Sequence, residues 1–145
     1  MAGTSEEFPQ TIANVTCVAI CGRGLLIEGP PGSGKSSLAF ALIDRGGVLV
    51  GDDGITLEQQ RDRLWAAPPP NIAGKLEVCG VGLIDLPTAR APLALILALD
   101  PNAPRSPSIN RRDLAGHTLP CLAFRTGDAT QALRAEAALR EFGIE

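Results

Sequence analysis

The sequence predicts a single α/β domain in which a mixed central sheet holds a phosphate-binding loop and its helix, and a second helix ends the chain. Three observations support this fold class. The apolar run 25–27 leads into a glycine-rich loop, and apolar residues with helical spacing follow the loop. Further strand-like segments occur on both sides of this unit. The 145 residues, 45% of them hydrophobic, suffice for one domain with a buried core.

Residues 29–36, Gly-Pro-Pro-Gly-Ser-Gly-Lys-Ser, fill the GxxxxGK[ST] pattern of a P-loop without a mismatch. Glycines in such a loop turn successive backbone N–H groups inward, and these form an anion-binding nest at a helix N-terminus. Lys35 is expected to reach the β- and γ-phosphates, and the Ser36 hydroxyl to bind Mg²⁺. The alternative is a plain Gly/Pro-rich turn between a strand and a helix. The residues predicted to bind nucleotide are Gly29, Pro30, Pro31, Gly32, Ser33, Gly34, Lys35, Ser36 and Ser37.

The segments next to the loop predict a hairpin before it and a βαβ unit through it. Segments 15–20 and 25–27 read as strands joined by a short turn, which makes them antiparallel. Apolar residues at 38–43 predict a helix that stops at Gly46 and Gly47, and a short strand, 48–50, comes next. Because ligands collect at the carboxyl ends of parallel strands, Asp52 and Asp53 are expected beside the P-loop.

The rest of the chain predicts shorter elements around this centre. Residues 1–11 are expected to form a flexible tail, and residues 12–145 one domain. Asp128 is expected to cap the last helix and Gly143 to end it. The remaining expected elements are a hairpin and loop within 54–74, strands at 76–78, 83–86, 93–99 and 119–124, a proline-rich loop at 101–108 and a helix at 128–142.

Several carboxylates are candidates for phosphoryl-transfer chemistry, which needs Mg²⁺ and a group that activates the nucleophile. Asp52 and Asp53 could supply a base and a metal or water ligand, although a solvated turn is an alternative for the pair. Asp100, at the end of an apolar strand, is a rival metal ligand or a simple loop cap. Glu77 lies in an apolar strand and either has a partner or metal, or faces water on an edge strand.

The composition makes other classes of function improbable. The net charge of −3, the absence of tyrosine and an aromatic content of 3% disfavour a nucleic-acid surface. No apolar run is long enough to span a membrane, and the N-terminus lacks the pattern of a signal peptide, so a cytoplasmic location is expected. The four cysteines, without a CxxC pair, are expected to be reduced and buried.

The motifs together resemble the catalytic domain of HPr kinase/phosphorylase, in the short proteobacterial form. The resemblance rests on 16–20 (TCVAI), the P-loop, 42–46 (LIDRG), 48–53 (VLVGDD) and 74–82 (GKLEVCGVG), and it covers residues 12 to 86 well and the last third loosely. It implies a P-loop fold of the HPr kinase (PEP carboxykinase-like) type and an ATP- and Mg²⁺-dependent serine kinase. Its substrate would be HPr, the carrier protein of the sugar phosphotransferase system, with a role in regulating carbon metabolism.

The same resemblance implies phosphorolysis of phosphoserine, a hexamer and a C-terminal helix that helps to dock the substrate. By position, Asp52 would be the base, and Asp53 and Glu77, with Ser36, would hold metal and water.

Asn14 stands where the family usually has histidine, Cys79 where it has arginine, and Ser37 where short relatives have an acidic residue. These departures favour a second hypothesis, a nucleotide- or phosphate-sensing module with weakened chemistry. A third is a small-molecule kinase with Arg111 and Arg112 on a lid.

Overall fold

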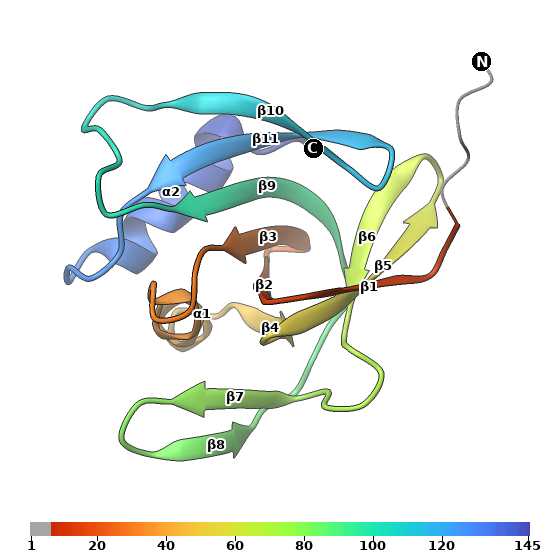
Figure 1. Ribbon diagram of the computed structural model, residues 1–145, viewed down its shortest axis with the longest axis horizontal. Helices are drawn as coiled ribbons and strands as arrows, with labels where there is room; N and C mark the ends of the chain where they lie inside the picture. Colours follow the sequence, from red (N-terminus) through yellow and green to blue (C-terminus); the bar gives the residue numbers. More distant parts are fainter. Residues whose placement is uncertain (1–6) are drawn as a thin grey trace.

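The computed structural model describes residues 7–145, which form eleven strands and two helices (Figure 1). The strands are β1 (Gln10–Ala13), β2 (Val15–Ile20), β3 (Arg23–Glu28), β4 (Val48–Gly51), β5 (Gly54–Gln60), β6 (Arg63–Ala67), β7 (Lys75–Val78), β8 (Gly82–Asp85), β9 (Ala91–Leu99), β10 (Ile109–Leu114) and β11 (His117–Phe124). The helices are α1 (Lys35–Asp44) and α2 (Gln131–Phe142).

Strand β9 joins the parts of a mixed, nine-stranded sheet. Its first residues pair with β6, and through β6 with β5 and β1. The rest of β9 lies between β3 and β11 and runs parallel to both. Strand β2 pairs antiparallel with β3 and with β4, while β10 pairs antiparallel with β11. The apolar sequence of β9 is explained by this position, since a strand covered on both faces needs apolar residues on each.

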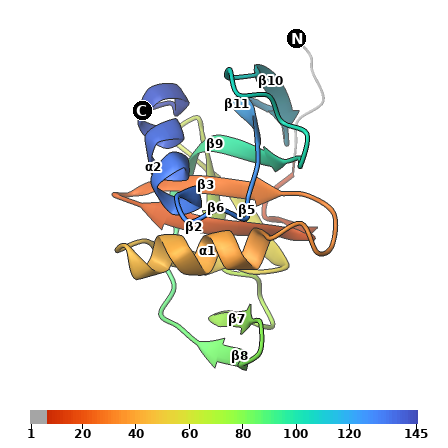
Figure 2. The same cartoon turned by 90° about the vertical axis from the view of Figure 1, so that its left-hand side faces the viewer.

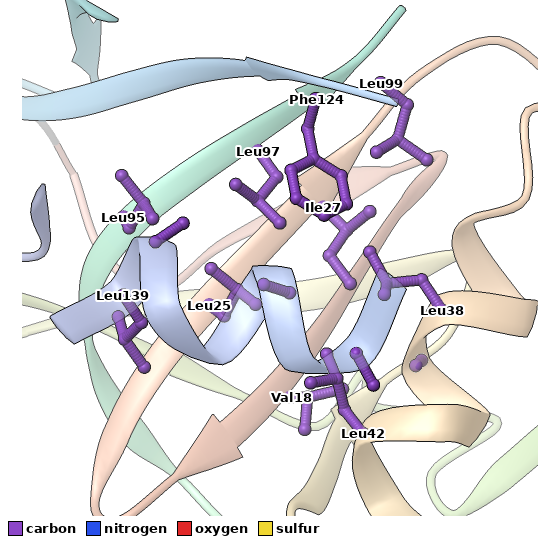
Figure 3. Close-up of a cluster of buried hydrophobic side chains, with 14 of the residues drawn as sticks. Val18, Leu25, Ile27, Leu38, Leu42, Leu95, Leu97, Leu99, Phe124 and Leu139 are labelled. Atoms are coloured by element: carbon purple, nitrogen blue, oxygen red, sulfur yellow. The ribbon is translucent and has the colours of Figure 1, made fainter. Parts of the chain in front are cut away.

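Two hydrophobic clusters, one on each face of the sheet, hold the layers together. One cluster packs α1 and α2 against β2, β3, β9 and β11, and Figure 3 shows Leu38 of α1 near Ile27 of β3 and Leu42 of α1 near Val18 of β2. The other fills the space between the opposite face and the β1–β5–β6 strands. In Figure 2 both helices lie in front of the sheet, α2 above β3 and α1 below it in the view. Within residues 7–145, neither helix is long and apolar enough to cross a membrane.

Strands β7 and β8 form a separate two-stranded hairpin, which lies beyond α1 and apart from the main sheet (Figures 1 and 2). Leu76 of β7 is fully buried and belongs to the helix-side core cluster, so it anchors the hairpin to the domain. The tip of the hairpin is open to solvent, with Val81 and Leu83 each 70% exposed. The hairpin therefore lies beside the first turn of α1 and borders the space next to it.

The structure confirms the predicted fold class and most predicted elements. The β2–β3 hairpin, helix α1, strand β4, the β5–β6 hairpin, strand β9 and strand β11 all lie where the sequence places them. The βαβ unit needs one correction, because β2 lies between β3 and β4. Since β2 is antiparallel to both, β3 and β4 still run parallel to each other, and their carboxyl ends meet at one edge.

Two boundaries differ from the sequence-based expectation, which also missed β10 entirely. Strand β1 begins at Gln10, so the sheet includes two residues expected in the tail; residues 1–6 lie outside the described part of the chain. Strand β10 is an exposed edge strand whose Asn-Arg-Arg-Asp sequence shows no apolar alternation. Helix α2 begins at Gln131 after Thr130, and Asp128 instead accepts hydrogen bonds from Thr130 and Arg134. The expected end at Gly143 is confirmed.

Substituting Leu97 on β9 tests the central role of this strand. Leu97 is fully buried, so Leu97→Ala is expected to lower the free energy of unfolding by about 2–5 kcal/mol, through lost burial and a residual cavity. Urea denaturation followed by circular dichroism measures this loss. Leu83→Ala, at a position 70% exposed, is the control and should change the stability by less than about 0.5 kcal/mol. Equal losses in the two variants would contradict the assignment of β9 to the core.

Candidate functional site

The loop between β3 and α1 has the backbone shape that phosphate binding requires. Gly32 and Gly34 have φ angles of 80° and 100°, a region that favours glycine. A Cβ at Gly29 would lie 2.6 Å from Ser33 Oγ, so a side chain there would fill the loop. Lys35, almost buried, donates hydrogen bonds from Nζ to the carbonyl oxygens of Gly29 at 2.7 Å and Pro30 at 3.3 Å. The lysine is thus held across the loop that precedes it.

Asp52 lies next to the first turn of α1. It is 7% exposed, and its Oδ1 accepts hydrogen bonds from Ser36 Oγ at 2.8 Å and Thr16 Oγ1 at 2.9 Å. The backbone N–H of Glu77 lies 3.4 Å from the other oxygen, Oδ2, which is a long contact. The expectation that Asp52 lies beside the P-loop is therefore confirmed. Both hydroxyls donate to Oδ1, so Oδ2 has only the long contact from the Glu77 N–H and receives no side-chain donor.

A hollow of about 750 Å³ separates the P-loop from the β7–β8 hairpin, and we call it the loop–hairpin hollow. Its walls combine Lys35 and Ser36 from the P-loop side with Asp53, Glu77 and Cys79. Both Asp53 and Glu77 are exposed, so Glu77 is not the buried carboxylate that its apolar strand suggested. The loop side of the hollow also includes Pro31, Gly32, Gly34 and Ser37. Residues 78 and 80–82 of the hairpin line the opposite side.

The donor chemistry of this hollow fits a phosphate group together with a magnesium ion. Within residues 7–145, no three histidine, cysteine or acidic side chains converge as a preformed metal cage. Mg²⁺ usually keeps several waters and takes one or two carboxylates plus phosphate oxygens, so scattered oxygen donors suit it. Ser36, Asp53 and Glu77 provide such donors on the walls of one hollow. Ser33 Oγ, buried and without a partner in the described chain, is a further polar group inside the loop.

Two rival candidates from the sequence lie outside this hollow, although Asp100 adjoins the loop residues 30–33 in a smaller one. Asp100 is exposed and accepts a hydrogen bond from the backbone N–H of Asn102 at 2.8 Å, which is a local loop contact. Arg112 lies on β10 rather than on a lid, and its guanidinium pairs with the Glu28 carboxylate through both terminal nitrogens. The hydrogen bond to Glu28 is the main reason that the pKa of Arg112 is raised above its usual value. Neither Asp100 nor Arg112 lines the loop–hairpin hollow.

The sequence analysis missed two threonines that support the loop. Thr16 is fully buried in an otherwise apolar strand, and a polar residue in that setting is a signal for a buried partner, here Asp52. Thr126 follows β11 and donates from Oγ1 to the Ser33 carbonyl oxygen at 2.8 Å. A Cβ on Gly34 would lie 2.9 Å from the same hydroxyl. Nothing local in the sequence predicts this contact, since it joins residues 93 positions apart.

Asn14 and Cys79, where the chain departs from the family pattern, both lie near the carboxylates. The Asn14 backbone N–H donates to the Asp53 carbonyl oxygen at 3.0 Å, and both residues have positive φ angles, of 65° and 60°. Cys79 lines the loop–hairpin hollow. Among the described residues on the walls of this hollow, Lys35 is the only basic side chain. Both positions named in the sequence analysis therefore adjoin the carboxylates, so the side chains there bear on the charge and the proton donors of the site.

The fold and the loop define an α/β protein of the P-loop class. The family described as HPr Serine kinase C-terminal domain matches residues 7–90, which is more than half of the sequence. The chain therefore belongs to the HPr serine kinase C-terminal domain family. Strands β1 to β8, the P-loop and Asp52 all fall within the matched residues.

Curated relatives and a solved structure agree with this membership. The chain is 40% identical over 80 residues to HPr kinase/phosphorylase of Clostridium tetani, and 42% identical over 85 residues to that of Shouchella clausii. These alignments cover 55% and 58% of this chain but 26% and 27% of the relatives, so the chain spans about a quarter of their length. The Hpr(Ser) kinase/phosphatase from Coxiella burnetii superposes with a TM-score of 0.78 at 29% identity. That match covers 90% of this chain and 88% of the other, so the shared fold extends into the last third.

The four cysteines differ in accessibility, which corrects the expectation that all are buried. Cys17 and Cys121 are buried, whereas Cys21 and Cys79 are exposed, and all four are free thiols. Burial raises the pKa of the Cys17 thiol far above its usual range. Burial also raises the pKa of Cys121, although Arg112 opposes this effect. Since the thiolate is the reactive form, the two buried cysteines should react slowly.

Thiol labelling checks this division. In the native protein at neutral pH, a disulfide reagent such as DTNB should modify Cys21 and Cys79 rapidly and Cys17 and Cys121 only after denaturation. The absorbance of the released thiolate gives the number of fast sulfhydryls, and Cys79→Ser should remove one of them. Fast reaction of all four thiols in the folded protein would contradict the structure.

Proposed function

We propose that this chain carries the catalytic site of an ATP-dependent serine kinase/phosphorylase that acts on HPr, the carrier of the sugar phosphotransferase system. The observation that carries the proposal is the 2.8 Å hydrogen bond from Ser36 Oγ to Asp52 Oδ1, because it joins the phosphate-binding loop to the carboxylate pair. The family membership supports the choice of a serine kinase over other P-loop functions. The names of the relatives support HPr as the substrate.

Each polar residue of the site has a role in this proposal. The loop 29–37 binds the nucleotide phosphates through its N–H groups, and Lys35 moves its ammonium from the Gly29 carbonyl onto the transferred phosphoryl group. Asp52 accepts the proton of the incoming serine hydroxyl on Oδ2, the oxygen that the two hydroxyls leave free. In the reverse direction the same carboxylate orients inorganic phosphate for attack on phosphoserine.

Ser36, Asp53 and Glu77 are the residues that would hold Mg²⁺, since all three line the loop–hairpin hollow. A bound Mg²⁺ would neutralise charge between the β- and γ-phosphates. Asp53 is exposed, which suits a carboxylate that binds a metal ion together with water. Asp52 is buried, which suits a carboxylate that accepts a proton. We further propose a cytoplasmic location, a hexamer and a docking role for α2, as the resemblance to the family implies.

Phosphoryl transfer to HPr tests the proposal. Incubation with ATP, Mg²⁺ and HPr should add the mass of one phosphoryl group to HPr, as measured by mass spectrometry. Asp52→Asn and Lys35→Ala should each lower the rate at least about a hundredfold, since they remove the base and the phosphate-binding cation. Asp113→Asn is the matched control, because the same change is made in an exposed carboxylate of the β10–β11 hairpin that does not line the loop–hairpin hollow. A folded, nucleotide-bound wild type without transfer to HPr would overturn the proposal.

A second candidate function is a nucleotide- or phosphate-sensing module in which transfer is weak. The observation that favours it is the composition of the loop–hairpin hollow, where Cys79 takes the place of a family arginine and Asn14 adjoins Asp53. Asparagine can hydrogen-bond a carboxylate but cannot carry a proton near neutral pH. Without the arginine, the site also lacks a fixed positive charge that would stabilise the transferred group.

Restoring the two side chains distinguishes the two candidates. If their loss weakened the chemistry, Asn14→His with Cys79→Arg should raise the HPr phosphorylation rate about tenfold or more, through proton exchange and charge stabilisation. Histidine is compatible with the positive φ of position 14. Cys21→Arg, at the other exposed cysteine, is the control for added charge alone. No gain in the double variant would refute the explanation that these substitutions limit transfer.

A further inference from the structure

A second hollow lies on the far side of the P-loop from the β7–β8 hairpin, between the starts of the two helices. We call it the α1–α2 hollow; it has a volume of about 410 Å³. Its walls are formed by the P-loop segment and the β11–α2 connection, through Gly32, Ser33, Gly34, Ser37, Thr126, Gly127 and Gln131. The N-termini of α1 and α2 both border it, and the positive ends of two helix dipoles favour a ligand with negative charge.

The two hollows meet over the P-loop, because Gly32, Gly34 and Ser37 line both. Lys35, Ser36 and Asp53, the groups assigned to phosphoryl transfer, line only the loop–hairpin hollow. A nucleotide whose terminal phosphate lies among these groups can continue across the loop glycines into the α1–α2 hollow. This second space is within the range of volumes typical of small-ligand pockets, about 300–1,000 Å³.

The lining of the α1–α2 hollow fits a hydroxylated sugar better than a base. The residues on its walls are polar or glycine, and none of those described is aromatic. Gln131 Oε1 accepts a hydrogen bond from the Gly127 backbone N–H at 3.0 Å, which fixes the orientation of the side-chain amide. Its Nε2 donates to no group within residues 7–145, so two N–H donors are available at the wall.

We propose that the α1–α2 hollow binds the ribose and the 5′-phosphate end of the nucleotide, with Gln131 donating hydrogen bonds from Nε2 to them. The proposal rests on the proposed nucleotide-dependent function and adds the residues that recognise the nucleoside end. Thr126 and Gly127 form the rest of this wall, and the bond from Thr126 to Ser33 holds the wall against the loop. Gln131 and Thr126 lie outside the residues 7–90 that match the family. Recognition of the nucleoside end thus comes from the last third of the chain.

Comparing ATP with inorganic tripolyphosphate tests this subsite, since only ATP has a nucleoside. Isothermal titration in the presence of Mg²⁺ would measure both affinities for wild type, Gln131→Met and Gln60→Met. Methionine has similar length and flexibility but lacks both the N–H donors and the Oε1 that accepts from Gly127, so Gln131→Met should weaken ATP binding about fivefold. Its affinity for tripolyphosphate should stay within about twofold of wild type, because the P-loop contacts remain. Gln60→Met makes the same change on the exposed β5–β6 hairpin and should alter neither affinity.

The possible failures of this test differ from one another. Equal weakening of ATP and tripolyphosphate by Gln131→Met would show that Gln131 acts on the P-loop, and it would overturn the subsite. Unchanged binding of ATP would overturn it as well. If the folded wild type bound neither compound, the nucleotide-dependent function itself would be refuted. Thermal denaturation of each variant checks that the proteins compared are folded.

Discussion

The site depends on one constraint: strands β3 and β4 run parallel and end at the same edge of the sheet. The P-loop follows β3 and Asp52 follows β4, so their parallel course places Ser36 within 2.8 Å of the carboxylate. Strand β2 supplies this geometry by pairing antiparallel with both, and it also supplies Thr16, the second donor to Asp52. A buried carboxylate without such donors would be strongly destabilising, so the two hydroxyls are part of what makes the site stable.

Much of this centre could be predicted from the sequence, because local patterns determine it. The glycines, Lys35 and Ser36 specify the loop, and the helical spacing of residues 38–43 specifies helix α1 directly after it. A strand one helix later leads to Asp52, and that order was enough to place the carboxylate beside the loop. The order of strands in the sheet was beyond reach, since nothing in the segment 15–20 indicates that it lies between β3 and β4.

Prediction was weakest where long-range contacts or exposed edges decide the structure. Strand β10 contains charged residues because it lies at an edge, and its pairing with β11 provides the order that its sequence does not suggest. Thr126 and Gln131 reach the P-loop from the far end of the chain, through a contact that only the folded sheet creates. The exposure of Cys79 likewise results from the hairpin standing apart from the core, which the sequence of residues 76–86 does not reveal.

The position of β9 has a consequence for biosynthesis. Strand β3 leads into the P-loop and pairs along one edge with β9. The residues of β9 leave the ribosome some 70 positions later than those of β3 (Figure 1). Until then β3 presents unpaired N–H and C=O groups on an apolar strand, which is a template for association with other chains. The nascent chain can complete its sheet only when β9 and then β11 are available, and both strands lie outside the segment that matches the family. This edge therefore stays unpaired for longer during synthesis than the edges of a sheet that forms from neighbouring hairpins.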